Sequence, residues 1–262
     1  MRWPLHTGVL ALLLVQACGL QSGTFGPQGF HHTRYDYEVR YADAGTRRMM
    51  PAGWQLDNYR QTSSGLVAKN AGFYKSSFEF DTNRDDRPDS VDTVPTFDLR
   101  FAHEKTGAVV WLRSIPSPNY DSNQALYMLS RDYLAGVSAV GVELAQFGLQ
   151  GTTGEKRFVV QVLESRQAQL ASLEALAMTL EVANLSELKR STKAQRKRVR
   201  LVLARAGLMH RLPAGDAEFP TVLVAGYANQ PEFFQQQLSE FHAFLERIVL
   251  EERTGYRESA AL

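Results

Sequence analysis

The chain has 262 residues, of which 44% are hydrophobic and 22% are charged, so it can bury a substantial core. The 29 lysines and arginines nearly balance the 28 aspartates and glutamates, and the formal net charge is +1. This balance gives no global attraction to nucleic acid and argues against a DNA- or RNA-binding protein.

The amino-terminal residues have the pattern of a secretory leader. Met1-Arg2 supplies a positive charge, and an uncharged apolar run follows over residues 8–15. This run is shorter than the roughly 20 residues that a helix needs to cross a bilayer. We therefore expect the chain to be exported and to have no transmembrane span.

Cys18 follows this run in the sequence Val15-Gln16-Ala17-Cys18-Gly19, which resembles the lipobox of bacterial lipoproteins. The resemblance implies that residues 1–17 are a signal peptide, that the Cys18 thiol receives a diacylglycerol, and that the new amino terminus is acylated, for example with palmitate. Cys18 is the only cysteine, so it has no disulfide partner within the chain. The alternative is an ordinary cleaved signal peptide in which Cys18 is incidental.

The residue after the cysteine bears on location. Gly19 stands there instead of aspartate, and in lipoproteins resembling this one that implies export to the outer membrane. Several acyl chains anchor a protein durably, because each buried methylene contributes about 0.8 kcal/mol. The first expected partner is therefore the membrane itself, through the lipid anchor.

The sequence predicts three regions after the leader. Residues 18–33 are rich in glycine and polar residues and predict a flexible tether, in which His31 and His32 are mobile. A single domain is expected over residues 34–250, followed by a polar tail at 251–262.

Strand patterns dominate the first half of this domain. Residues 35–41 alternate between aromatic or aliphatic and charged side chains, which predicts a strand, and a second extended piece is expected at 54–59. Residues 97–101 and 108–113 are strand formers on either side of the turn sequence at 104–107, which predicts a hairpin.

Helix signals appear later in the chain. Asp121-Ser122 can cap a helix that packs on the sheet, and the apolar spacing between Phe158 and Val182 fits either two strands or a helix. Strands are expected at 199–203 and 219–227. A long amphipathic helix is expected from Pro231 onward. Its apolar stripe consists of Phe234, Leu238, Phe241, Leu245 and Ile248.

This order of elements predicts an α+β fold, an α/β sandwich in which helices cover one or both faces of an antiparallel sheet. Residues 51–54, 97–101, 107–110 and 221–227 resemble the PsbP-like and DcrB-like proteins found among exported lipoproteins. The resemblance extends over roughly residues 50–250. It implies a sandwich of that type and a non-enzymatic accessory role.

An acidic stretch between two predicted strands, residues 81–92, has oxygen-bearing side chains at the spacing of a calcium loop. It resembles the loops of EF-hand and dockerin proteins, but Asp86 stands where glycine is expected and Pro88 stiffens the loop. The alternative is a solvated acidic turn. The candidate ligands are the side chains of Asp81, Asn83, Asp85, Asp89 and Asp92 and the main-chain carbonyl of Arg87.

A basic cluster precedes and enters the strand predicted at 199–203. It is either a solvated strand face or a contact for an anionic surface, such as lipid headgroups or an acidic partner. Its members are Lys189, Arg190, Lys193, Arg196, Lys197, Arg198 and Arg200.

Catalytic motifs are incomplete. Ser138 lies in a sequence that resembles a nucleophile elbow, but Val140 stands where that motif requires glycine. His103 lacks the second histidine of a zinc-protease helix, and His210 and His242 are isolated in the sequence. We therefore expect no enzyme and no cofactor other than calcium.

The expected function is that of a non-enzymatic, lipid-anchored subunit that binds other envelope proteins in an outer-membrane assembly for surface motility, adhesion or secretion. The competing hypothesis is a periplasmic small-ligand carrier or hydrolase that uses a pocket on the sheet.

Overall fold

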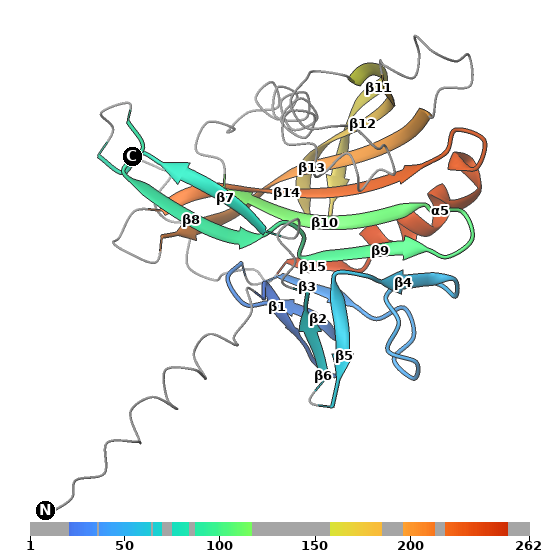
Figure 1. Ribbon diagram of the computed structural model, residues 1–262, viewed down its shortest axis with the longest axis horizontal. Coiled ribbons are helices and arrows are strands. Elements are labelled where there is room, and N and C mark those ends of the chain that lie inside the picture. The colour runs from blue at the N-terminus through green and yellow to red at the C-terminus, as the bar shows by residue number, and fades with distance from the viewer. Residues whose placement is uncertain are drawn as a thin grey trace, which may run out of the picture.

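The structure is a computed structural model that describes residues 21–35, 37–63, 65–69, 75–83, 87–116, 158–184, 196–212 and 218–250. These residues form fifteen strands and one α-helix (Figure 1). The elements are β1 (Gly23–Phe25), β2 (Gly29–His32), β3 (Tyr37–Arg40), β4 (Trp54–Leu56), β5 (Tyr59–Thr62), β6 (Gly65–Ala68), β7 (Lys75–Phe80), β8 (Ser90–Pro95), β9 (Leu99–His103), β10 (Val109–Pro116), β11 (Phe158–Leu170), β12 (Leu173–Asn184), β13 (Arg196–Arg211), β14 (Glu218–Asn229), α5 (Phe234–Leu245) and β15 (Ile248–Leu250).

A seven-stranded sheet forms the centre of the molecule, in the order β11-β12-β13-β14-β10-β9-β4 (Figure 1). Every pair of neighbours in it is antiparallel. The hairpin expected around residues 104–107 is present as β9 and β10, and the strands expected at 199–203 and 219–227 lie within β13 and β14.

A smaller sheet of four strands has the order β1-β2-β3-β15, so the end of the chain returns to pair with its beginning. Its β1 and β2 come from the segment expected to be a flexible tether. That expectation is wrong for the described residues 21–33, because Phe30 is fully buried and His32 is 3% exposed. The glycines of this segment lie in closely paired strands, and its polar residues include one that makes a buried polar contact.

The central strands of the large sheet are buried on both faces. Along β10 all eight residues are buried, with Val110 and Leu112 in one hydrophobic cluster and Val109 and Trp111 in another. The first cluster lies between this sheet, the small sheet and α5, whose Phe241 stacks on Tyr227 of β14 at 5.7 Å between ring centroids.

The α+β prediction is wrong, because the described residues are mostly strands with one helix of 12 residues. Two physical reasons account for this. In β12 successive residues are buried on opposite faces of the sheet and show no polar alternation, so the helical spacing between Phe158 and Val182 is fortuitous and β11 and β12 form instead. The C-terminal helix is short because Ile248 starts β15 and pairs with Val39. The helix expected after Asp121 lies outside the described residues.

Polar contacts fix α5 on the edge of the sheet. The indole N–H of Trp54 on β4 donates to Glu240 at 2.6 Å. Gln237 accepts hydrogen bonds from Thr106 at 2.9 Å and from Asn229 at 2.8 Å. The helix is therefore held by β4, by the turn between β9 and β10, and by the end of β14.

Gly226 is predicted to be a position where a methyl group is not tolerated. Trp111 of β10 lies directly opposite it, and a Cβ at residue 226 would fall inside the contact distance of the indole ring. Gly226→Ala should lower the free energy of unfolding by about 1–3 kcal/mol, as overpacked cores do. Urea denaturation monitored by tryptophan fluorescence measures this, with Gly26→Ala, where the nearest atom is 4.0 Å away, as control. Equal stability of the two variants would contradict the packing described.

Candidate functional site

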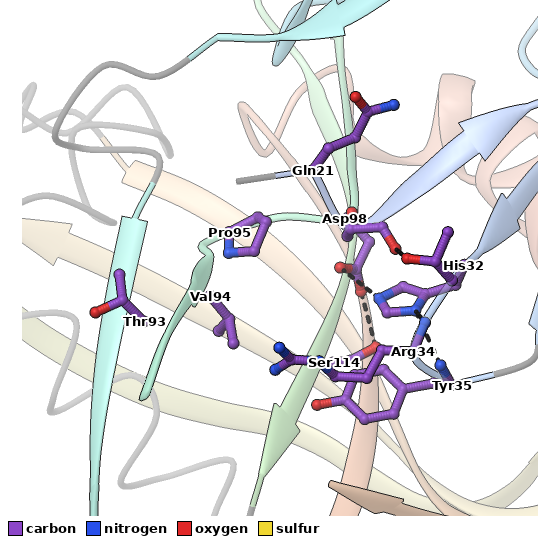
Figure 2. A pocket seen from close by; sticks show the side chains of 11 residues that line it. Gln21, His32, Arg34, Tyr35, Thr93, Val94, Pro95, Asp98 and Ser114 are labelled. Carbon is purple, nitrogen blue, oxygen red and sulfur yellow. Dashed lines mark hydrogen bonds and ion pairs between the residues drawn. The ribbon is translucent and has the colours of Figure 1, made fainter. Parts of the chain in front are cut away.

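A buried carboxylate, Asp98, lies where the two larger sheets meet (Figure 2). His32 of β2 approaches it with Nε2 at 3.3 Å from Oδ1. The hydroxyls of Tyr37 on β3 and Ser114 on β10 each donate to Oδ2 at 2.8 Å. We call these four residues the Asp98 cluster. One carboxylate thus binds side chains from three strands of two sheets.

The geometry around His32 fixes its proton. Its Nδ1 lies 3.1 Å from the backbone N–H of both Arg34 and Tyr35, and these groups can only donate. Nδ1 therefore accepts, and the hydrogen on Nε2 is directed at Asp98. Both ring nitrogens of His32 are occupied by the protein itself.

Charge is retained on Asp98 despite its burial. Burial disfavours the ionised form, but the neighbouring His32 ring and the hydrogen bonds from His32, Tyr37 and Ser114 favour it more, and the pKa of Asp98 lies below its usual value. Burial, followed by the charge of Asp98, raises the pKa of Tyr37 well above its usual range. The cluster therefore holds one anion, bound by three donors.

A cavity of about 120 Å³ borders the Asp98 cluster. In Figure 2 Gln21, Arg34 and Thr93 surround it together with members of the cluster. Its volume lies below the roughly 300–1,000 Å³ typical of pockets for drug-sized ligands. Arg34 donates to Asp92 at 2.9 Å, so charge on this side of the cavity is balanced.

The Asp98 cluster contains aspartate, histidine and serine, the residue types of a hydrolytic triad, but the hydrogen bonds between them differ from those of a triad. In a triad the serine hydroxyl binds the histidine, which takes its proton. Here Ser114 donates to Asp98, and the acceptor nitrogen of His32 is occupied by two backbone N–H groups. The arrangement can therefore cross-link strands but does not activate Ser114.

Two of the predicted calcium ligands have partners within the protein. Asp92 lies on β8, is 7% exposed, and accepts from Arg34. Asp89 binds the backbone and hydroxyl of Thr82 at 3.0 and 2.7 Å, and these bonds lower its pKa. Asp85 lies outside the described residues. The remaining predicted ligands, Asp81, Asn83 and Arg87, belong to the connection between β7 and β8. Within the part of the chain that is described, no three His, Cys, Asp or Glu side chains gather to hold a metal ion.

The basic cluster is divided by the pleat of β13. Arg198 and Arg200 point to the side of α5, where Arg198 lies 5.8 Å from the ring centroid of Phe234. Lys197 alternates to the opposite face and is buried, and burial lowers its pKa. The other predicted members, Lys189, Arg190 and Lys193, lie outside the described residues.

Carboxylates form ion pairs with three arginines of β13. Arg196 and Arg198 lie 2.7 and 3.4 Å from Glu181 of β12. Arg200 is 5% exposed and donates to Glu164 of β11 at 2.8 Å. These pairs connect three neighbouring strands, so much of this basic charge is used within the sheet.

A groove of about 200 Å³ separates this charged face from α5. Leu163 and Arg166 of β11 line one side, and Leu238 and His242 of α5 line the other. Burial, then the charges of Arg200 and Arg166, lowers the pKa of His242. His242 is therefore a neutral boundary residue at neutral pH, as its isolated position in the sequence suggested.

Cys18, the predicted lipidation site, lies outside the described residues, close in sequence to their start. Ser22, four positions after it, is 5% exposed, and β1 begins at Gly23. None of the described helices is long and apolar enough to span a membrane.

Sequence patterns gave no sign of the Asp98 cluster. His32 was assigned to a tether, and Asp98 lies in the loop before β9, where an aspartate is ordinary. Ser114 and Tyr37 lie 16 and 61 positions from Asp98 in the sequence, and His32 lies farther still. A contact of this range leaves no local signal.

No family model and no curated protein matches the chain in sequence. Among solved structures, cyanobacterial PsbP (CyanoP) from Synechocystis sp. PCC 6803 is similar with a TM-score of 0.35 and 8% identity, over 77% of this chain and 94% of that chain. LpqN of Mycobacterium tuberculosis, described as involved in cell envelope biogenesis, has a TM-score of 0.37 and 10% identity, over 84% and 87%.

Removing the carboxylate of Asp98 should be strongly destabilising. Asp98→Ala leaves three buried donors without their acceptor, so we expect a loss of roughly 3–5 kcal/mol in the free energy of unfolding. Tyr37→Phe removes one donor and should lose about 1–3 kcal/mol. Ser77→Ala, on an exposed strand, is the control and should change little. Urea denaturation of the three variants measures these values. A loss in Asp98→Ala no larger than in Tyr37→Phe would show that the carboxylate does not hold the cluster.

The same cluster predicts a pH dependence. Because the folded-state pKa of Asp98 is depressed, folding favours its ionised form, and this stabilisation is complete above about pH 4. It is lost as the pH falls through the folded-state pKa. The stability difference between the wild type and Asp98→Asn should therefore shrink below about pH 4. A difference that is constant from neutral to acidic pH would contradict an ionised Asp98.

Proposed function

We propose that the protein is a lipid-anchored component of a bacterial cell envelope that binds other envelope proteins and performs no catalysis. The observation that carries the proposal is the short stretch of chain between Cys18 and the folded body. Two residues, Gly19 and Leu20, separate Cys18 from Gln21, the first described residue, and the three steps from Cys18 to Gln21 span at most about 3.6 Å each, or roughly 11 Å in all. A lipid on Cys18 would hold the small sheet close to the bilayer surface.

The absence of an activated nucleophile in the Asp98 cluster supports a binding role. Ser114 donates to Asp98, and His32 has no ring nitrogen left for a substrate proton. The adjoining cavity has a volume of about 120 Å³, which leaves room for only a few ligand atoms. These features favour a binding protein over the carrier or hydrolase hypothesis.

The finer parts of the proposal come from the sequence. Gly19 after the cysteine favours the outer membrane, and an accessory role in motility, adhesion or secretion agrees with an anchored body. Arg196 of the predicted basic cluster is 51% exposed and could contact an anionic surface.

Cys18→Ala should abolish lipid labelling. We expect the wild-type chain to incorporate a fatty-acid analogue and to fractionate with membranes, and the variant to incorporate none. Gln16→Ala, which keeps the cysteine and brings a favoured small residue into the lipobox-like sequence, is the matched control and should be labelled. An unlabelled wild-type chain would sink the anchor proposal.

Crosslinking in the same strains tests the binding role. Crosslinking in intact cells should give adducts with envelope proteins for the wild type, and these should decline for Cys18→Ala, which is no longer held at the membrane. Identical adducts from both proteins would show that anchoring does not place the binding surface.

Calcium binding by the 81–92 loop stays a prediction. Calorimetric titration of the wild type with Ca²⁺ should give heat that is lost in Asp81→Ala and Asp85→Ala, since a hard cation needs several carboxylate ligands. Asp43→Ala, at an exposed turn elsewhere, is the control. Heat that is equal in all four proteins, or no heat above ionic background, would leave the loop as a solvated turn.

A further inference from the structure

The large sheet ends in an unusually long strand. Its order places β11, with 13 residues, at one edge and β4, with 3 residues, at the other. The edges of the four-stranded sheet, β1 and β15, also have 3 residues each. At about 3.3 Å per residue, β11 extends for roughly 43 Å. Proteins keep edge strands short or covered because unpaired N–H and C=O groups invite another strand. Of these four edges, β11 alone departs from that rule.

The outer part of β11 is exposed on both faces of the sheet. Residues 161–167 are all exposed, although strand alternation sends them to opposite sides. They include Val162 and Leu163, which are 42% and 44% exposed and are two of the four large hydrophobic side chains found exposed among the described residues. Among the described strands, β12 is the partner of β11, on one side. An exposed strand with apolar side chains at its edge is a typical surface for strand addition.

We propose that β11 pairs antiparallel with β11 of a second copy of this chain, about a two-fold axis at Ser165. The sheet would then continue across both molecules. In this register Glu164 faces the partner's Arg166, and Arg166 faces the partner's Glu164. Opposite charges placed directly across two strands stabilise their pairing, whereas like charges oppose it.

The self-complementary order of charges is the reason for choosing a second copy as the occupant. Glu164 and Arg166 lie on the same face, 3.2 Å apart within one chain, so each copy presents one acid and one base to the other. In the same register Val162 and Leu163 face the partner's Ala168 and Gln167, which would cover the exposed apolar side chains. A two-fold contact uses the same edge of both molecules, so assembly stops at two.

An irregularity in β11 limits the alternatives. The register against β12 shifts between Val162 and Glu164, which marks a bulge at Leu163. A bulge bends its strand and increases the local twist, and so disfavours the flat stacking of many copies. The regular stretch carrying Glu164, Ser165 and Arg166 follows directly after it. This is the part of the edge where the charges match.

A cysteine at the proposed axis tests the register directly. Opposite Cα atoms of antiparallel strands lie about 4.5–5.5 Å apart, within the roughly 4.4–6.8 Å that a disulfide spans. Full-length Ser165→Cys, purified in detergent and mildly oxidised, should form a covalent dimer, and peptide mapping should find the linkage between two copies of residue 165. Ser77→Cys, on the exposed strand β7, is the control and should remain uncrosslinked. No dimer for Ser165→Cys would overturn the proposal.

Charge exchange tests the pairing without a covalent bond. Arg166→Glu places two carboxylates opposite each other and should weaken dimerisation at least tenfold in analytical ultracentrifugation of the full chain. The double variant Glu164→Arg with Arg166→Glu restores opposite charges and should recover most of the affinity. Thermal denaturation checks that each variant is folded. A monomeric wild type, open-ended oligomers, or equal affinities of the single and double variants would each contradict the two-fold pairing. The outcome does not depend on whether Cys18 is lipidated.

Discussion

The carboxylate of Asp98 is the contact on which the arrangement of the two larger sheets depends. It lies in the loop that leads into β9 and receives hydrogen bonds from His32 of β2, Tyr37 of β3 and Ser114 of β10. Hydrogen bonds to a charged group contribute about 1.5–3 kcal/mol each, and together they offset the unfavourable burial of the charge. Because the donors come from both sheets, the small sheet cannot leave the large one without exposing or stranding this anion.

This contact also determines where the amino terminus lies. Burial of His32 fixes the turn at Arg34 and Tyr35 that leads from β2 into β3 through two backbone N–H groups, and β1 in turn pairs with β2. Since β1 starts at Gly23, the candidate anchor at Cys18 has little chain available for movement. A residue triplet that suggests catalysis by its composition thus has a positional role, and any lipid on Cys18 would lie close to the small sheet.

The success of sequence reasoning depended on whether one face of an element meets solvent. Residues 35–41 alternate in polarity, and the strand β3 lies there as expected. The turn at 104–107 between two apolar runs likewise predicted β9 and β10. In β12, by contrast, Ala175 and Ala177 face one core and Leu176 and Met178 face the other. With both faces apolar, spacing no longer separates strand from helix. The Asp98 cluster escaped notice for another reason, since its contacts are long-range and each residue is unremarkable in its local context.

The burial of each charged side chain in the large sheet determines which contacts it can make. On β13, Arg200 is buried and satisfied by Glu164, so it acts between strands, whereas Arg166 at the edge remains 60% exposed. An anchor near β1 and a pairing edge at β11 would operate together on a membrane. Two copies anchored in one bilayer leaflet must point their lipids the same way, which requires the two-fold axis through Ser165 to run along the membrane normal. Confinement to a surface raises the effective concentration of one copy around another, so a pairing that forms in solution would be more fully populated at the bilayer.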